Sequence, residues 1–148
     1  MSSWLITGGT GSFGHAFTRY LLDRGAERVV ILSRDALKQA EMRASFGDPR
    51  LRFFVGSVVD TDRVTVAMRG VEYVVHAAAM KRVEVCEDNP NEAVQTNVIG
   101  TATVARGCIE AGVSRAVFLS TDKAVAPNTL YGMTKAAAER VWCRSNVY

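Results

Sequence analysis

Two groups of residues in the last third of the chain combine side chains that can move protons. The run Ser-Thr-Asp-Lys occupies residues 120–123, and Tyr131 precedes Lys135 by four positions. If the segment from Thr129 onward is helical, Tyr131 and Lys135 lie on one face. An ammonium beside a phenol favours the phenolate, so a tyrosine whose ordinary pKa is about 10 can act as a base nearer neutral pH. A strand, a loop and an amphipathic helix with ordinary surface side chains would give the same pattern, and this stretch alone does not decide between the two interpretations.

The residues at 120–123 follow a segment that should form a strand. The apolar run from Ala116 to Leu119 is followed by turn signals, which predicts a buried strand in a covered parallel sheet. Residues 120–123 would then lie at the carboxyl end of that strand, where open α/β sheets bind their ligands.

The beginning of the chain contains a glycine loop between a strand and a helix. The apolar run Trp4–Thr7 precedes it, and a helical pattern follows as far as Gly25. The loop consists of Gly8, Gly9, Thr10, Gly11, Ser12, Phe13 and Gly14. Its spacing fits GxGxxG, which lets the backbone approach a pyrophosphate at a helix amino terminus. An ordinary glycine-rich turn is the alternative, but the position between strand and helix favours dinucleotide binding.

The end of the next strand bears on the choice of cofactor. Residues 28–32 form an apolar run, and Ser33 and Arg34 stand where NAD-binding proteins usually carry an acid. Arg34 offers a planar set of donors suited to a 2′-phosphate, which favours NADP, and Lys38 could add to that site. A solvated surface charge is the alternative for Arg34. Asp35 reads as the residue that starts a helix over Ala36–Phe46.

Further strands and helices alternate along the rest of the chain. We expect strands at 51–55, 73–76 and 115–119, a short helix around 64–68, and a long helix from Asn91 to Ala111. Its inner stripe should be Val94, Val98, Ala102 and Ala105. This order predicts an α/β protein with a doubly wound parallel sheet, the Rossmann fold, in one domain spanning 1–148.

The residues after the fourth strand are of two kinds. Ala77, Ala78 and Ala79 are small, so backbone and cofactor can approach closely there, and His76 should be a packed strand-end residue. Lys81 and Arg82 lie where substrate phosphates could arrive, although ordinary surface charge explains them equally well.

Composition excludes several classes. The net charge of +3 comes from scattered arginines, so we expect no nucleic-acid partner. Three cysteines without metal-type spacing indicate no metal site and a reduced, cytoplasmic protein. No signal peptide and no membrane-spanning apolar run are evident.

With these motifs assembled, the chain resembles the extended short-chain dehydrogenase/reductase superfamily. The resemblance rests on TGGTGSFG at 7–14, HAAA at 76–79, TNVIGT at 96–101 and YGMTK at 131–135. Within it, SRDALKQ, CEDNPNEAVQTNVIGT and STDKAVAPNTLYGMTK are similar to the inverting UDP-N-acetylglucosamine 4,6-dehydratases of polysaccharide biosynthesis. Tyr131 stands where the membrane-anchored, C5-retaining relatives typically carry methionine, which indicates the inverting branch.

The resemblance implies roles for particular residues. Tyr131, assisted by Lys135 and Thr121, would remove the C4 hydroxyl proton of UDP-N-acetylglucosamine as hydride passes to NADP⁺. Asp122 and Lys123 would act as the acid/base pair that eliminates water across C5 and C6. Hydride then returns to C6 and C5 is reprotonated on the opposite face, so no net oxidation occurs.

The chain departs from the family pattern in two respects. Where the family usually has Gly-Asp-Val to hold the adenine amino group, this chain has Gly56-Ser57-Val58; Ser57 can accept a hydrogen bond without charge, and Asp60 lies too far along to replace the acid. Family members also continue into a carboxyl-terminal substrate domain, so the resemblance implies a Rossmann domain truncated before it. Two hypotheses remain open: the nucleotide-binding half of a dehydratase, or a free-standing NADP-binding partner or sensor with little activity.

The resemblance also implies self-association. The long helix 91–111 and the helix after Thr129 should lie side by side, and in the extended family two such helices from each subunit form the dimer contact. The fifth strand should also lie near an open sheet edge, which invites pairing with another chain. We therefore expect a homodimer or a higher oligomer.

Overall fold

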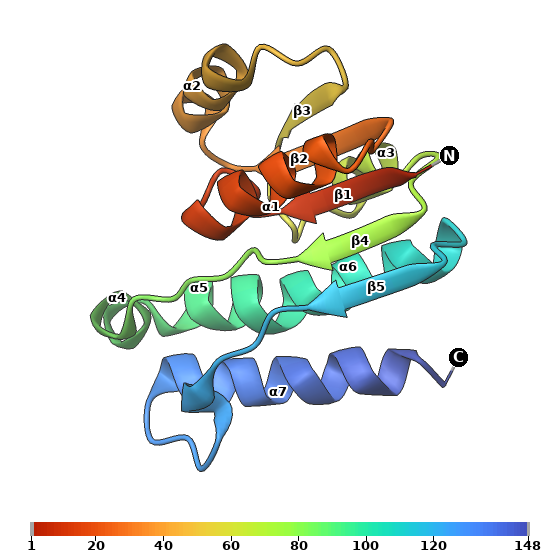
Figure 1. Ribbon diagram of the computed structural model, residues 1–148. Helices are drawn as coiled ribbons and strands as arrows, with labels where there is room; N and C mark the ends of the chain where they lie inside the picture. Colours follow the sequence, from red (N-terminus) through yellow and green to blue (C-terminus); the bar gives the residue numbers. More distant parts are fainter. Residues whose placement is uncertain (1, 148) are drawn as a thin grey trace.

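The computed structural model describes residues 2–147 and contains one five-stranded sheet, all of whose strand pairs are parallel. The strand order is β3-β2-β1-β4-β5 (Figure 1). The strands are β1 (Ser3–Thr7), β2 (Arg28–Ser33), β3 (Leu51–Val55), β4 (Tyr73–His76) and β5 (Arg115–Phe118). The predicted doubly wound α/β fold is confirmed, because the order reverses at β1, from which the sheet grows in both directions.

Helices follow each of the five strands. They are α1 (Ser12–Asp23), α2 (Ala36–Phe46), α3 (Thr61–Ala67), α4 (Val83–Asp88), α5 (Pro90–Val94), α6 (Gly100–Glu110) and α7 (Leu130–Ser145), with a π-helical segment η1 (Gln95–Ile99) and a 3₁₀ turn η2 (Asp122–Ala124). The bounds of α2 and β3 match the prediction at both ends. Asp35 starts α2 as expected, since its side chain accepts a hydrogen bond from the Lys38 amide. The short helix α4 was not predicted.

The sheet separates two apolar cores. On β1, Leu5 packs into one core with α3 and α6, while the next residue, Ile6, packs into the other with α1 and α2. This alternation is the period of two that a strand imposes. Trp142 packs against the first core and Trp4 against the second. Burial of one such aliphatic side chain contributes about 1.5–3 kcal/mol, so both faces of the sheet hold the fold together.

The long helix predicted for 91–111 is interrupted. η1 inserts a π turn between α5 and α6, which shifts the buried face around the axis. The predicted inner stripe is therefore wrong at Val94, which is 39% exposed, and Val98 and Ala102 are only partly buried; Ala105 is buried as expected. The buried residues on the two sides of the shift include Ala93, Thr96, Asn97, Thr101, Val104 and Cys108.

β5 lies at the edge of the sheet, as predicted, but the expectation of a covered strand is wrong. Its Val117 side chain is 54% exposed, and within residues 2–147 β5 pairs with β4 alone. α7 and α6 pack side by side, which confirms their predicted arrangement (Figure 1). None of the helices between residues 2 and 147 is both long and apolar enough to cross a membrane.

Candidate functional site

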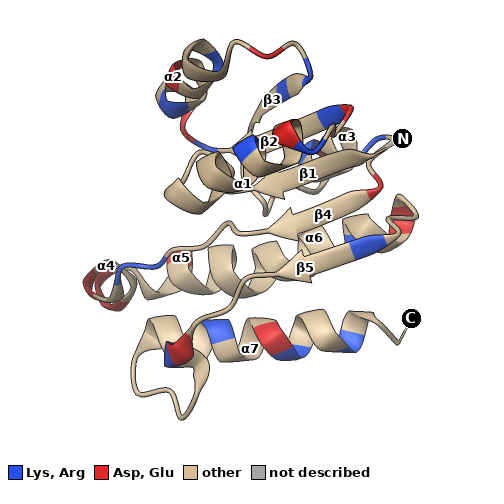
Figure 2. Cartoon of the chain, viewed as in Figure 1, with Lys and Arg blue, Asp and Glu red and all other residues tan. Residues whose placement is uncertain are grey.

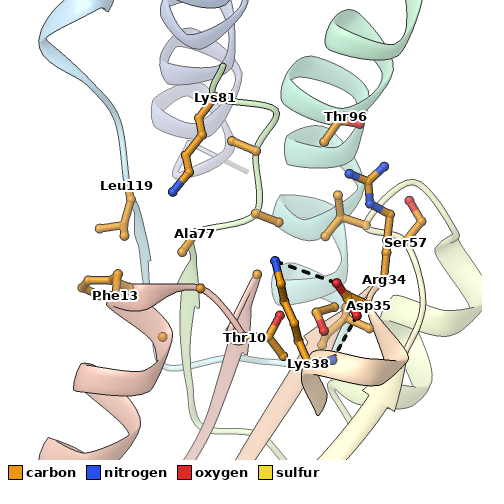
Figure 3. A pocket seen from close by; sticks show the side chains of 18 of the residues that line it. Thr10, Phe13, Arg34, Asp35, Lys38, Ser57, Ala77, Lys81, Thr96 and Leu119 are labelled. Atoms are coloured by element: carbon orange, nitrogen blue, oxygen red, sulfur yellow. Dashed lines mark hydrogen bonds and ion pairs between the residues drawn. The ribbon is translucent and has the colours of Figure 1, made fainter. Parts of the chain in front are cut away.

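An open pocket of about 680 Å³ lies at the carboxyl ends of the strands (Figure 3). Most of the predicted cofactor residues line it: Gly8, Thr10, Gly11, Ser12, Phe13, Gly14, Ser33, Arg34, Lys38, Ser57, Val58, Ala77, Ala78, Ala79, Tyr131 and Lys135. The glycine loop from the beginning of the chain and α7 from its end therefore meet at one cavity. Its volume is in the range of small-molecule and cofactor sites.

The glycine loop is shaped by close backbone approaches. Gly8 has a φ of +66°, and a Cβ there would lie 2.8 Å from the Cα of Ala78. A Cβ on Gly14 would collide with the carbonyl oxygen of Gly9. Gly9 does not line the pocket, and a Cβ there would lie 2.9 Å from the Cγ2 of Ile31; its backbone contact with a cofactor stays a prediction. Gly9 thus serves packing between the loop and β2.

The amino terminus of α1 faces this pocket without a side-chain cap. Its N-cap residue is Gly11, no side chain bonds to the first turn, and that turn contains no acidic residue. By contrast, Asp35 caps α2 and Thr129 caps α7. The first amides of a helix together with its dipole favour an anion, so the loop fits a pyrophosphate.

The residues after β2 form the wall where Arg34 lies beside Ser57 (Figure 3). The Asp35 carboxylate also lines the pocket, but it accepts from the Lys38 amide at 3.0 Å and pairs with the Lys38 Nζ at 3.8 Å. Lys38 therefore lines the pocket, and the Asp35 carboxylate partly balances its positive charge. The Ser33 hydroxyl accepts a bond from Gln39 at 2.9 Å, which fixes the strand end.

The wall formed by the loop after β3 carries no carboxylate. Ser57 lines the pocket, and its hydroxyl also accepts a bond from the Val59 amide at 3.3 Å. Asp60 caps α3 by accepting from the Arg63 amide at 3.0 Å and does not line the pocket. This agrees with the expectation that Asp60 lies too far along to contact an adenine.

Tyr131 and Lys135 come from the first two turns of α7 and are both buried. The Lys135 ammonium donates to the carbonyl oxygen of Leu119 at 2.7 Å and lies 4.1 Å from the centre of the Phe118 ring. Burial lowers the pKa of Lys135 to about 8, and the negative charge of Glu139 partly opposes that shift. A lysine with this pKa can hold or release a proton near neutral pH.

The loop of Thr121, Asp122 and Lys123 lies next to the pocket but does not line it. The Thr121 hydroxyl donates to Asp122 at 3.1 Å and accepts from the Lys123 amide at 3.3 Å. The hydroxyl of Thr121, followed by the charge of Lys123, lowers the pKa of Asp122. Asp122 and Lys123 are exposed and Thr121 is partly exposed, so a substrate above the pocket could reach them.

His76 is a packed strand-end residue, as predicted. It is completely buried, with Thr7 Oγ1 2.6 Å from its Nδ1 and Thr101 Oγ1 3.0 Å from its Nε2. Burial lowers its pKa to about 3, with a further contribution from the charge of Lys135, so the ring is neutral at physiological pH.

Sequence reasoning missed Asn97, which joins the pocket loop to α7. Its side-chain oxygen accepts from the Met80 amide at 2.8 Å. Its amide nitrogen donates to the Met80 carbonyl and to Thr134 Oγ1, both at 3.0 Å. Asn97 belongs to η1, and the π turn directs it inward. The TNVIGT run contained this residue, but no local pattern marks a π turn.

The possible metal-ligating side chains are scattered over the part of the chain that the structure describes. There, no three His, Cys, Asp or Glu side chains are grouped so that they could hold a metal ion. The three cysteines are free: Cys86 and Cys108 are buried, and Cys143 is exposed.

The chain is similar to a polysaccharide biosynthesis family and to enzymes named for UDP-sugars. A profile of the family described as polysaccharide biosynthesis protein matches residues 4–148. An inverting UDP-N-acetylglucosamine 4,6-dehydratase from Campylobacter jejuni is 48% identical over 143 residues, which cover 96% of this chain and 43% of that protein. A UDP-glucose 4-epimerase from Rickettsia rickettsii is 44% identical over 141 residues, covering 93% of this chain and 41% of the relative.

A solved structure of a protein with NAD bound shares the fold. The dTDP-glucose 4,6-dehydratase DesIV from Streptomyces venezuelae, with NAD bound, superposes with a TM-score of 0.86 at 32% identity, over 94% of this chain and 50% of that one. The chain thus spans half or less of the length of these three proteins.

Proposed function

The chain belongs to the polysaccharide biosynthesis protein family, within the extended short-chain dehydrogenases/reductases, and from that membership we propose that it forms the cofactor-binding and catalytic half of a nucleotide-sugar 4,6-dehydratase. The observation that carries the proposal is the convergence of the glycine loop, Tyr131 and Lys135 on one pocket. We assign residues 1–148 to one NADP-binding Rossmann domain.

The pocket residues fit a nicotinamide dinucleotide. The uncapped start of α1 and the close approach of Gly8 to Ala78 suit a pyrophosphate, and the small side chains at 77–79 leave room beside it. Lys135 would donate to a ribose hydroxyl. When bound, NADP⁺ would supply the acceptor, and later the donor, of a hydride.

The chain's own residues would move the protons. Tyr131 takes the proton of the sugar C4 hydroxyl, aided by the neighbouring charge of Lys135 and by Thr121. Transfer of a proton from the Lys123 ammonium to the paired Asp122 carboxylate would prepare both groups. Asp122 then protonates the departing C6 hydroxyl, and the neutral Lys123 takes the proton from C5 once the C4 ketone has acidified it. Both groups are already accessible beside the pocket, at 3.5 Å from each other.

We propose NADP rather than NAD as the cofactor. Arg34 at the end of β2 offers paired donors for a 2′-phosphate, whereas the one carboxylate nearby, Asp35, is engaged as the cap of α2. The DesIV structure contains NAD, so titration of this chain with both dinucleotides is the test of the proposal.

The substrate that we propose is UDP-N-acetylglucosamine, with inversion at C5. The 48% identity to the Campylobacter jejuni enzyme and the presence of Tyr131 support it. The 44% identity to a UDP-glucose 4-epimerase supports a second candidate, which would share oxidation at C4 but would not need Asp122 and Lys123.

One experiment separates these candidates. The purified chain is incubated with NADP⁺ and UDP-N-acetylglucosamine, and the products are followed by NMR. We expect NADP⁺ binding but little turnover, because remote contacts that hold the sugar can supply roughly 7–11 kcal/mol of barrier lowering and the chain spans 43% of its relative. Any 4-keto-6-deoxy product should disappear in Lys123→Ala, whereas a C4 epimer as the product would favour the epimerase.

Binding without any turnover, even after many hours, would also fit the second hypothesis, a free-standing NADP-binding partner or sensor. The test is to read the gene beyond codon 148 and, where the reading frame continues, to repeat the incubation with the longer chain. Dehydration restored in the longer chain supports the half-enzyme; binding without dehydration in both supports the sensor. We place either role in the cytoplasm, in keeping with three free cysteines.

A further inference from the structure

Two successive turns of α7 hold two successive residues at the end of β5. Lys135 donates to the backbone carbonyl of Leu119 at 2.7 Å, and Glu139, one turn later, accepts a hydrogen bond from the Ser120 hydroxyl. Ser120 lines the pocket and directly precedes Thr121. The α7 helix therefore fixes the start of the 121–123 loop through both side chains.

Glu139 also bears on the charge of Lys135. It is the sole acidic residue between Leu130 and Ser145, where Lys135, Arg140 and Arg144 carry positive charge (Figure 2). Its carboxylate stands four residues after Lys135 and raises the pKa of that lysine against the effect of burial. The other titratable groups near Lys135 are His76 on β4, which is neutral, and Tyr131 and Lys81, which line the same pocket.

We propose that Glu139 is a positioning residue, which anchors the 121–123 loop through Ser120 and holds the charge of Lys135 beside Tyr131. The importance of Glu139 for catalysis rests on the proposed function. The hydrogen bond to Ser120 and the effect of the Glu139 charge on Lys135 do not depend on it. One carboxylate would then set both the place of the acid/base loop and the protonation of the lysine that assists the base.

Two variants separate the two effects. Glu139→Gln keeps an acceptor for Ser120 but removes the charge. Ser120→Ala removes the hydrogen bond but keeps the charge. Glu110→Gln is the matched control, since Glu110 is an exposed glutamate at the end of α6, far from the carboxyl ends of the strands (Figure 1).

The readouts need no ligand. The chain has four lysines, at 38, 81, 123 and 135, so NMR titration of the lysine ¹³Cε signals can resolve each, with Lys135→Arg identifying the signal of interest. We expect a midpoint near 8 for Lys135, lowered by about half a pH unit or more in Glu139→Gln and unchanged in Ser120→Ala and Glu110→Gln. A midpoint unmoved in Glu139→Gln overturns the proposal.

The anchoring effect is read by amide hydrogen exchange in the loop. The amides of Lys123, Ala124 and Val125 are held by bonds to Thr121 and Asp122. We expect them to exchange several-fold faster in Ser120→Ala than in the wild type, Glu139→Gln or Glu110→Gln. Equal exchange rates in all four chains overturn the proposal.

A titration with NADPH distinguishes this proposal from the proposed function. If both effects are found in a chain that binds no NADPH, the positioning role is supported and the dinucleotide function fails. If NADPH binds but neither effect is found, the dinucleotide function stands and the role of Glu139 is overturned.

Discussion

At the scale of residues, the site combines groups that the sequence predicts with groups that it does not. Tyr131, Lys135 and Arg34 were predictable because their types carry the chemistry and their places follow strand ends and helix starts. Asn97 was not, because its inward direction depends on a π turn. The packing of Gly9 against Ile31 was not predictable either, because a motif position does not say which side chains surround a glycine. The hydrogen bond between Ser120 and Glu139 was also not predictable, because it depends on how α7 packs against the end of β5.

The cofactor preference is the first residue-scale prediction. Arg34→Ala should weaken NADPH binding roughly 10- to 100-fold, the weight of one charge-assisted hydrogen bond, and leave NADH binding nearly unchanged. Fluorescence titration of both dinucleotides measures it. Lys38→Ala, at a lysine already paired with Asp35, serves as the comparison and should have the smaller effect. Equal affinities of the wild type for NADPH and NADH would remove Arg34 from this role.

The buried Lys135 should make stability depend on pH in a defined direction. Its pKa falls from 10.5 to about 8 on folding, so between these values the unfolded chain binds more protons than the folded one. Stability should therefore rise with pH in that window. Urea unfolding should show the wild type gaining roughly 1–3 kcal/mol relative to Lys135→Met between pH 7 and 10. A constant difference between the two chains would show that Lys135 is charged, or neutral, at both pH values.

At the scale of elements, α7 is built around a glycine that makes room for the loop. A Cβ on Gly132 would collide with the carbonyl oxygen of Lys123. The predicted helix start was correct because Thr129 caps it, a local signal; the contact that Gly132 permits comes from packing. Local signals also explain why both ends of α2 were predicted correctly, since Asp35 caps its start and the left-handed Gly47 ends it. The π turn at 95–99 has no such local signal and was not predicted.

This contact gives the element-scale prediction. Alanine normally stabilises a helix by about 1 kcal/mol relative to glycine, but Gly132→Ala should destabilise the chain because backbone atoms must move. Thermal unfolding measures the sign. Met133→Ala, at the exposed next position of the same helix, is the control and should be close to neutral. A stabilised Gly132→Ala chain would mean that η2 does not press against α7 in solution.

At the scale of the whole molecule, we expect self-association. α6 and α7 lie side by side with exposed apolar side chains, among them Ile99 on η1 and Ile109 and Met133 on these helices, while β5 offers a free edge with Val117 exposed. Apolar exposure of this kind favours a partner surface.

Light scattering tests the assembly and its route. A homodimer or higher oligomer is expected, and Ile99→Asp should dissociate it if the helices form the contact, whereas Val117→Asp should do so if the edge of β5 does. A monomer at high micromolar concentration would count against both routes.

The positions of the two tryptophans allow the unfolding of each side of the sheet to be followed by tryptophan fluorescence. Trp4 packs on the core beside α1 and α2, and Trp142 packs on the core beside α3 and α6, so each side of the sheet carries its own emitter. Trp4→Phe and Trp142→Phe each leave one emitter in place. Because Leu5 and Ile6 of β1 pack into the two different cores, neither core can unfold without the other. The emission spectra of the two variants should therefore change at the same temperature.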